Sequence, residues 1–516
     1  WKGVKLNIYK YLNDDLTNLE LFINKISLEN KKNLKKLDIN YLINTIESSN
    51  AIIKFKDFNK SNKLIILSDL NFLFKNIRYK ENDLKFEIEQ FNLKNNYDLD
   101  LKNLSSFFTF SNKKISFKDA NINFGRSNII ADLKFDFTKI NEMTFQEISD
   151  SLFFNLNLKN SEIISSDFNS FYDKINISYV SKWVLNGELI GTLNNLTLNN
   201  IILTNDENIV KFSSLVKNLF SNNKDYDLSI DFNKIKTSSK TVDLIFPKIF
   251  GTIIPSSLNE LGTFELVGIA KINSNQVESD FDLKVNNGSI KSSLEISELS
   301  KIDNAVYKGI LKGNNLDLSK FINISGVGKS NFEFDISGRG FTTDYLNSSI
   351  IGKINNISYQ NQIFENIEIF GQVKDRVFDG NLISNDDNLN LVFNGLIDFR
   401  NDLIDFDFNT TVNNADLYNL GFYQKANLSG EITVKLRGSD MKNLIGDLTI
   451  KNGKYFNDEK VTDFNNFYAQ LRNNENKKII NISSNDIING ILIGEYDFFN
   501  LKSSLFNSLG NHYSNY

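Results

Sequence analysis

The sequence predicts an all-β protein: an elongated, curved antiparallel β-trough with an internal repeat of about 100 residues and a few short helices. One observation is a period-two alternation of apolar and polar residues along most of the chain, as in NFEFDIS at 331–337 and ITVKL at 432–436. Another is the asparagine, aspartate and glycine between these runs, which favour tight turns. Neighbouring runs should therefore pair as antiparallel strands of a sheet with one apolar and one polar face.

A third observation is a stretch of alternating sequence that occurs twice, about 100 residues apart. YKGILKGNNLDL at 307–318 is similar to FDFNTTVNNADL at 406–417, and each copy is followed by a strand that ends in glycine, at Gly338 and at Gly438. Repetition at a fixed period is typical of arrays whose units contact mainly their neighbours. We expect five segments: a β-rich N-terminal segment at 1–140 with a short helix near 14–26, a trough segment at 141–240, and trough repeats at 241–321, 322–420 and 421–510, the last of them truncated.

Short elements interrupt the predicted sheet. SSDFNSFYD at 165–173 and PSSLNELG at 255–262 have helix-capping serine, proline or glycine at their ends. Four Asn-Gly pairs are predicted to form hairpin turns, because both residues tolerate positive φ. These pairs are Asn287-Gly288, Asn394-Gly395, Asn452-Gly453 and Asn489-Gly490.

Composition argues against several classes of protein. The net charge is −5 and lysines alternate with acidic residues and asparagine, so we expect no nucleic-acid partner. Cysteine is absent and His512 is the single histidine, which leaves no catalytic system of the Ser/His/Asp or Cys/His kind and no His-rich or thiolate metal site. Asp386 and Asp387 lie in an Asn-rich turn and are predicted to be solvated turn residues. We therefore expect no enzymatic activity, no metal and no cofactor.

The apolar face of the predicted sheet must be covered by something. A second sheet could close it as a sandwich, or an open trough could leave a continuous apolar groove for a partner that is not protein. Acyl chains suit such a groove, because each buried CH2 contributes about 0.8 kcal/mol without any specific polar contact. The alternation itself leaves both possibilities open.

Whichever possibility holds, the alternation names the residues that share this face. In the groove they would contact acyl chains, and in the sandwich they would form the core. The candidates are Phe135, Phe137, Leu228, Ile230, Phe232, Phe281, Leu283, Val285, Phe332, Phe334, Ile336, Leu389, Leu391, Phe393, Phe406, Phe408, Ile432, Val434 and Leu436.

Several stretches resemble a known family. GNNLDLSKF at 313–321, the run from 330 to 399 that begins SNFEFDISGRGF, NNADLYNLGF at 413–422 and GEITVKLRGSDMKNLIGDLTIKNGKY at 430–455 resemble TamB, the translocation and assembly module subunit of the AsmA-like group, in the form found in Bacteroidota. The likeness continues upstream in NSEIISSDFNSFYDKI at 160–175 and IIPSSLNELGTFELVGIAKI at 253–272. Its motifs consist of strands, turns and glycines, not catalytic residues.

The resemblance implies a function and a location. It implies a periplasmic trough that carries phospholipids between the inner and outer membranes in outer-membrane biogenesis, with an N-terminal inner-membrane anchor and a barrel partner of the TamA/BamA type. Neither end of such a protein is recognisable in this sequence, which looks like its middle. A second hypothesis is a chaperone-like scaffold whose strand edge assists insertion of outer-membrane barrels. A third, an adhesive or carbohydrate-active β-solenoid, is disfavoured by the 100-residue repeat and the hairpin turns.

Overall fold

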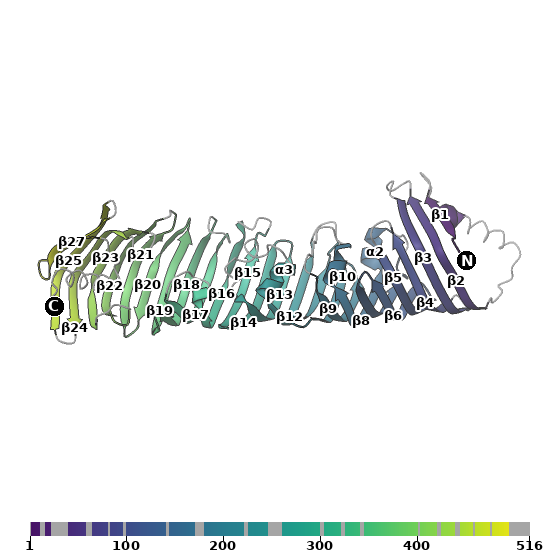
Figure 1. The fold of residues 1–516 in the computed structure, drawn as a ribbon, viewed down its shortest axis with the longest axis horizontal. Helices are drawn as coiled ribbons and strands as arrows, with labels where there is room; N and C mark the ends of the chain where they lie inside the picture. The colour runs from purple at the N-terminus through teal and green to yellow at the C-terminus, as the bar shows by residue number, and fades with distance from the viewer. Residues whose placement is uncertain are drawn as a thin grey trace, which may run out of the picture. The chain divides into compact units, whose positions relative to one another are not determined.

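The computed structural model consists almost entirely of β-strands joined by short connections (Figure 1). The predicted all-β fold class is confirmed. The structure describes residues 2–10, 16–21, 40–57, 64–80, 83–95, 100–140, 144–170, 180–220, 225–245, 261–299, 304–320, 326–340, 345–400, 403–420, 425–438, 444–457, 460–474 and 477–494. Within these ranges the chain forms two compact units: unit 1 (Trp1–Ile249 with Thr263–Ser274) and unit 2 (Phe250–Gly262 with Asn275–Tyr516).

Unit 1 contains thirteen of the described strands. They are β1 (Lys5–Lys10), β2 (Tyr41–Asp57), β3 (Leu64–Lys80), β4 (Asp83–Asn95), β5 (Asp100–Ser111), β6 (Lys114–Phe124), β7 (Ser127–Asp136), β8 (Phe153–Ile164), β9 (Lys182–Thr192), β10 (Asn195–Thr204), β11 (Ile209–Lys217), β12 (Asp227–Ser238) and β13 (Thr263–Asn273).

Unit 2 contains fourteen described strands. They are β14 (Gln276–Val285), β15 (Gly288–Ser297), β16 (Val306–Asp317), β17 (Val327–Arg339), β18 (Asn347–Tyr359), β19 (Gln362–Lys374), β20 (Val377–Asn385), β21 (Leu389–Asp398), β22 (Ile404–Asp416), β23 (Ala426–Gly438), β24 (Ile445–Asn457), β25 (Lys460–Asn474), β26 (Lys477–Ser483) and β27 (Asn489–Gly494).

Within each unit, each described strand pairs with the next one in the sequence. The pairing is antiparallel from β2 to β13 in unit 1 and from β14 to β27 in unit 2, as predicted. One pair differs, because β1 runs parallel to the second half of β2, with Lys5 opposite Ile52. Each unit is thus a single-layer sheet that does not close into a barrel.

Helical elements are short and lie in the connections. Helix α2 (Phe145–Ser151) begins at the N-cap Thr144, whose hydroxyl accepts the Glu147 N–H. The others are η1 (Ser165–Ser170), α3 (Ser239–Ile245) and η4 (Leu318–Lys320). The helix predicted at 165–173 is therefore present as a 3-10 turn, and residues 18–21 of the predicted helix near 14–26 are helical. Most of the segment predicted at 255–262 lies outside the described residues.

A repeated irregularity bends the strands. Asn and Asp residues with positive φ occur inside strands, and the pairing register shifts beside them, which marks β-bulges. At five of these bulges the backbone N–H of the bulged residue donates to a side-chain oxygen on the next strand, so the donor that the bulge removes from the ladder is satisfied. These bonds are Asn50 to Asn71 (2.8 Å), Asp119 to Asp132 (2.8 Å), Asn160 to Asn186 (2.7 Å), Asn200 to Ser213 (3.1 Å) and Asn315 to Asn331 (2.6 Å).

We call the positions of these bulged residues the bend line. A bulge bends its strand and increases the local twist. Because the bulges recur on strand after strand near the same end of the ladder, the sheet curves along one line and becomes a trough within each unit. The curved antiparallel trough that the sequence predicts is thereby explained by local backbone geometry.

The repeat near 100 residues is also visible in the hydrogen bonding. Asp386 follows β20 and its Oδ2 accepts the Glu365 N–H of β19 at 2.8 Å. Asp486 follows β26 and its Oδ2 accepts the Asn465 N–H of β25, also at 2.8 Å. Both aspartates belong to a Ser-Asn-Asp sequence. The same turn therefore recurs 100 residues later with the same contact.

Two predicted turns are wrong. Asn394-Gly395 lies inside β21 and Asn452-Gly453 lies inside β24. Gly395 pairs with Phe408 in the sheet, and Asn452, with a φ of 50°, contributes a bulge in place of a turn. Asn287-Gly288 does connect β14 to β15, and Asn489-Gly490 begins β27.

Candidate functional site

The pairing register assigns every strand residue of unit 2 to one of two faces, because directly paired residues share a face. Two rows of directly paired residues cross all fourteen strands on one face without a single charged side chain, and we call them the open rows. One is Ser279, Leu294, Gly309, Ile336, Ile350, Gly371, Gly380, Gly395, Phe408, Val434, Leu448, Ala469, Ile482 and Gly490. The other is Val277, Ile296, Tyr307, Gly338, Ser348, Val373, Phe378, Ile397, Phe406, Leu436, Gly446, Leu471, Ile480 and Leu492.

Closer to the bend line, the same face of unit 2 carries the bend row, which is also uncharged. It comprises Leu283, Ile290, Gly313, Phe332, Ile354, Ile367, Ser384, Leu391, Val412 and Gly430. Between the bend row and the open rows lies a further uncharged row, which includes Phe281, Phe334, Phe393 and Ile432. We call the whole surface, from the bend row to the open rows, the apolar face. The opposite face is polar: between the two open rows it presents, for example, Glu278, Glu295, Lys308, Asp407 and Lys435.

Unit 1 has an apolar face of the same kind. One uncharged row crosses twelve strands, from β2 to β13. It comprises Tyr41, Tyr79, Leu84, Phe110, Ile115, Phe135, Phe154, Gly191, Leu196, Val216, Leu228 and Ile272. Phenylalanine dominates the neighbouring positions of β3 to β6, where the rings of Phe74, Phe86, Phe108 and Phe117 follow one another at centroid distances of 4.9, 4.5 and 5.2 Å.

The structure places the residues predicted from the alternation on these two faces. In unit 2 they lie together on the apolar face, including Phe332 in the bend row and Ile336 and Phe408 in the open rows. In unit 1, Phe135 and Leu228 belong to the same row, although four strands, β8 to β11, lie between β7 and β12. Phe137 follows the end of β7 and its ring lies 6.4 Å from that of Phe135.

Burial decreases away from the bend line. In the bend row of unit 2, Phe332, Ile367 and Val412 are only 5–7% exposed, whereas Phe334, Ile336 and Phe408 are half-buried. A closed sandwich would bury the middle of the face most completely, because a second sheet would cover it. The opposite gradient indicates that the core lies along the bend and that the open rows remain accessible.

Aromatic contacts run along the sheet. Phe393 of β21 packs against Phe408 of β22 at a centroid distance of 4.9 Å, and Phe86 of β4 packs against Phe108 of β5. Each of these pairs joins side chains of adjacent strands on one face. The rings therefore cover the floor of the trough and do not pack against an opposing layer.

At some glycines on this face, an aromatic ring lies directly against the backbone. A Cβ built on Gly313 would lie 2.2 Å from the ring of Phe332, and one on Gly453 would lie 2.1 Å from the ring of Phe464. Each phenylalanine is the direct cross-strand partner of the glycine that it covers. Because the glycine has no side chain, the ring can lie against the backbone, which is how an aromatic residue compensates for a glycine in a strand.

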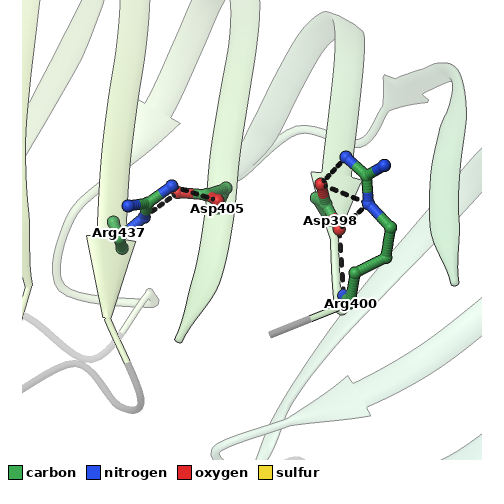
Figure 2. Close-up of polar contacts among 4 residues, drawn as sticks. All are labelled: Asp398, Arg400, Asp405 and Arg437. Carbon is green, nitrogen blue, oxygen red and sulfur yellow. Dashed lines mark hydrogen bonds and ion pairs between the residues drawn. The ribbon is translucent and has the colours of Figure 1, made fainter. Parts of the chain in front are cut away.

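The polar face carries ion pairs, and two lie close together at one end of β21 to β23 (Figure 2). Asp398–Arg400 is a local pair at the end of β21, and Asp405–Arg437 joins β22 and β23. Arg400 Nε donates to both carboxylate oxygens of Asp398 at 2.9 Å, and Arg437 Nη2 donates to Asp405 Oδ2 at 2.7 Å. The side-chain hydrogen bond from Arg400 lowers the pKa of Asp398, and that from Arg437 lowers the pKa of Asp405. Asp398 and Asp405 are direct cross-strand partners, so the two arginines prevent a repulsion between like charges.

Acidic side chains of the described ranges cap turns and form ion pairs. No group of three or more His, Cys, Asp or Glu side chains with metal-binding geometry occurs among these residues. Asp386, predicted above to be a solvated turn residue, lies in a turn but is buried, and it caps the turn by accepting the backbone N–H groups of Glu365, Asn388 and Leu389. No helix in the described part of the chain is long and apolar enough to cross a membrane.

Hollows are found on the polar face. One of about 530 Å³ is lined by Thr109, Ser116, Lys134 and Asn155 among others, and one of about 540 Å³ by Glu295, Lys308 and Asp335 among others.

Comparison with known proteins found no relative of this chain. No protein family, no curated protein and no solved structure matches this chain. The functional argument therefore depends on the geometry of the two faces.

Sequence reasoning missed two features of the site, the bend line and the glycines under aromatic rings. The bend line leaves a signal in the sequence, because a bulge inserts one residue and shifts the parity of the alternation. Leu196 and Leu198 are followed by Ile201 and Leu203, and the shift falls at Asn200. The covered glycines leave no such signal, because their partners are set by the register between strands.

Proposed function

We propose that this chain carries the hydrocarbon tails of phospholipids along its apolar face, as a segment of a periplasmic bridge of the TamB type between the inner and outer membranes. The supporting observation is the pair of open rows, which cross fourteen strands of unit 2 without a charged side chain and stay half-buried for most of their length. An exposed apolar surface of this extent is rare on a monomeric soluble protein and favours a partner.

The chemistry of the two faces fits an amphiphile. A lipid tail gains about 0.8 kcal/mol for each buried CH2, and the open rows offer it no charged group and only three hydroxyls, those of Ser279, Tyr307 and Ser348. The head group would remain in water at the edge of the sheet. Because each open row repeats apolar, glycine or serine positions from strand to strand, neighbouring sites are chemically similar, and a tail could move between them without crossing a charged position.

Photo-crosslinking at consecutive positions tests this proposal. A benzophenone amino acid is placed at Phe334, Asp335, Ile336 and Ser337 of β17, and the chain is irradiated after expression in cells with an outer membrane. Lipid adducts, detected by mass spectrometry, are expected at positions 334 and 336, which face the groove, and not at 335 and 337. Equal labelling at all four positions, or no lipid adduct at any, contradicts tail binding on this face.

A charge in the groove gives an independent test. Phe334→Asp places a carboxylate on the apolar face and should reduce the lipid that co-purifies with the chain at least fivefold. Asp335→Glu on the polar face of the same strand is the matched control and should leave the lipid content unchanged. Circular dichroism and thermal melting establish that both variants are folded.

A second candidate function is a strand template for nascent outer-membrane barrels, and β27 favours it. Among the described strands β27 pairs only with β26, it carries no charge, and Ile491 and Ile493 on its polar-face side are 69% and 59% exposed. An apolar edge without a charged residue is a site for strand addition. Crosslinks from position 493 to unfolded barrel proteins, abolished by Ile491→Lys and accompanied by no lipid in the groove, would favour this function over the first.

A further inference from the structure

One row on the polar face of unit 1 concentrates positive charge. Arg78 of β3 is the direct cross-strand partner of Lys85 of β4, and the row continues through Thr109 and Ser116 to Lys134 of β7. These positions contain three cations, two hydroxyls and no carboxylate. Like charges directly opposite each other on adjacent strands destabilise a sheet, so the Arg78–Lys85 pair requires a compensating interaction.

The described part of the chain does not supply an ion-pair partner to Arg78, Lys85 or Lys134. Carboxylates in the flanking rows already have partners. They are Asp83, which accepts a hydrogen bond from the Ser111 hydroxyl, Asp136, which pairs with Lys114 at 3.1 Å, and Asp132, which pairs with Lys159 at 2.6 Å. Glu87 is the remaining acidic neighbour, and it lies directly opposite Lys75.

The cationic row continues into a hollow. Thr109, Ser116, Lys134 and the next residue of the row, Asn155, line the space of about 530 Å³ described above. The Lys134 ammonium group can donate hydrogen bonds to the oxygens of an anion there, together with the one O–H that the Thr109–Ser116 hydrogen bond leaves free and the amide N–H of Asn155 that is not donated to Glu188. Asp136 also lines the hollow, and its carboxylate is paired with Lys114. The site is open to solvent, which suits an anion presented at a surface more than a ligand enclosed by the protein.

Exposed apolar residues lie at the same edge of the sheet. Tyr41, Leu42 and Ile43 begin β2 and are 54%, 68% and 41% exposed. Leu42 lies on the polar face as the cross-strand partner of Arg78. Tyr41 and Ile43 lie on the opposite, apolar face at the same end of β2, where the Tyr41 ring is 6.3 Å from that of its partner Tyr79. Tyrosine and aliphatic side chains beside basic residues are the combination that binds the interface of an anionic membrane.

We propose that this surface, which we call the cationic rim (Arg78, Lys85 and Lys134 with the apolar tip Tyr41–Ile43), docks on the surface of an anionic phospholipid bilayer. Phosphate groups neutralise the paired cations of β3 and β4, and the tip inserts among the head groups. Docking of this kind does not require that tails enter the trough, so the cationic rim is independent of the function proposed above.

Vesicle co-sedimentation tests the proposal with the full chain. Binding is compared between vesicles of phosphatidylcholine alone and vesicles with about one third phosphatidylglycerol. The rim variant Arg78→Gln/Lys85→Gln/Lys134→Gln should bind the anionic vesicles at least tenfold more weakly, because each basic residue at such a surface contributes roughly a factor of five. The matched control removes three exposed lysines of the polar face of unit 2, Lys284→Gln/Lys374→Gln/Lys451→Gln, and should stay within twofold of the wild type.

Each outcome of this experiment either supports membrane docking or overturns it. Preference for anionic vesicles that weakens on raising the salt concentration, and that is lost in the rim variant alone, supports docking. Equal binding of neutral and anionic vesicles, or equal binding by the rim and control variants, overturns it. If about 10 mM inorganic phosphate displaces the chain from vesicles at constant ionic strength, the site recognises a soluble oxyanion and the membrane proposal is wrong. Leu42→Ser, which leaves every cation in place, should weaken binding by a smaller factor.

Discussion

The phenyl ring of Phe332 lies over the backbone of its cross-strand partner Gly313, in the space that a side chain at position 313 would occupy. The ring is 6% exposed and belongs to the buried bend row of unit 2. This cross-strand contact joins β16 and β17, and it holds the ring flat against the sheet at that point.

Gly313→Ala should therefore destabilise unit 2. The new Cβ would lie 2.2 Å from Cε1 of Phe332, so the ring must leave its position. Overpacking of a well-packed site costs about 1–3 kcal/mol in the free energy of unfolding, which chemical denaturation can measure. The double variant Gly313→Ala/Phe332→Leu should be less destabilised than the sum of the two single changes. Strict additivity would show that the ring and the glycine are not coupled.

The bend line predicts different tolerances at two adjacent asparagines. Asn315 has a φ of 49° and its N–H donates to Asn331 Oδ1 at 2.6 Å, whereas Asn314 takes an ordinary strand conformation in its pairing with Ser289. Asn315→Ile should lower the free energy of unfolding by about 1–2 kcal/mol, because a β-branched residue disfavours positive φ. Asn314→Ile, an equally exposed change, should cost much less, and Asn315→Gly should be tolerated. Equal effects at 314 and 315 in denaturant titration would argue against the bulge.

The repeated turn predicts that the aspartate of each copy stabilises the chain, the buried Asp386 more than the exposed Asp486, which among the described residues accepts only the Asn465 N–H. Asp386 is 7% exposed and accepts three backbone N–H groups, from Glu365, Asn388 and Leu389. Asp386→Ala leaves these donors unsatisfied and should cost about 2 kcal/mol or more, and Asp386→Asn should cost less because one acceptor oxygen remains. Asp486→Ala should also destabilise the chain, while Asp387→Ala, beside the capping residue, should not. Thermal melting of the four variants provides the comparison.

The two arginine–aspartate pairs predict a pH dependence. The hydrogen bond from Arg400 lowers the folded-state pKa of Asp398, and that from Arg437 lowers the folded-state pKa of Asp405. Because the folded pKa is below the unfolded value of about 3.9, the stabilisation is present above that pH and is lost as the pH falls through the folded pKa. The melting temperature of Arg400→Gln/Arg437→Gln should be below that of the wild type at pH 6, and the difference should shrink as the pH falls below the unfolded value of about 3.9. A difference that stays constant over this range would exclude the ion pairs as its cause.

The fold class and the membership of the two faces could be predicted because alternation is a local property. A residue two positions from Phe332 must share its face, so Phe334 follows from the sequence without knowledge of any partner strand. The structure adds the cross-strand partners of each residue, which no local sequence pattern identifies. Phe135 and Leu228 share a row only because a series of pairings through β8 to β11 aligns them.

The missed features are those that depend on register or on a single backbone angle. Asn394-Gly395 has the composition of a hairpin turn, yet Gly395 lies in mid-strand opposite Phe408, where its lack of a side chain leaves room for the neighbouring Cβ. Asn452 has the same composition signal and takes positive φ inside β24. Asparagine suits a turn and a bulge for the same conformational reason, so composition does not separate them.

The nearest-neighbour pairing described for both units has a consequence for folding and for evolution. All-β proteins usually fold slowly because their strands come from distant parts of the chain. Within each unit, each described strand from β2 onward can pair with the preceding strand as soon as it is synthesised. The mean sequence separation of contacting residues, the contact order, therefore stays low although each sheet has many strands. For the same reason, gain or loss of one complete hairpin would lengthen or shorten the ladder and leave the direction of every remaining strand unchanged.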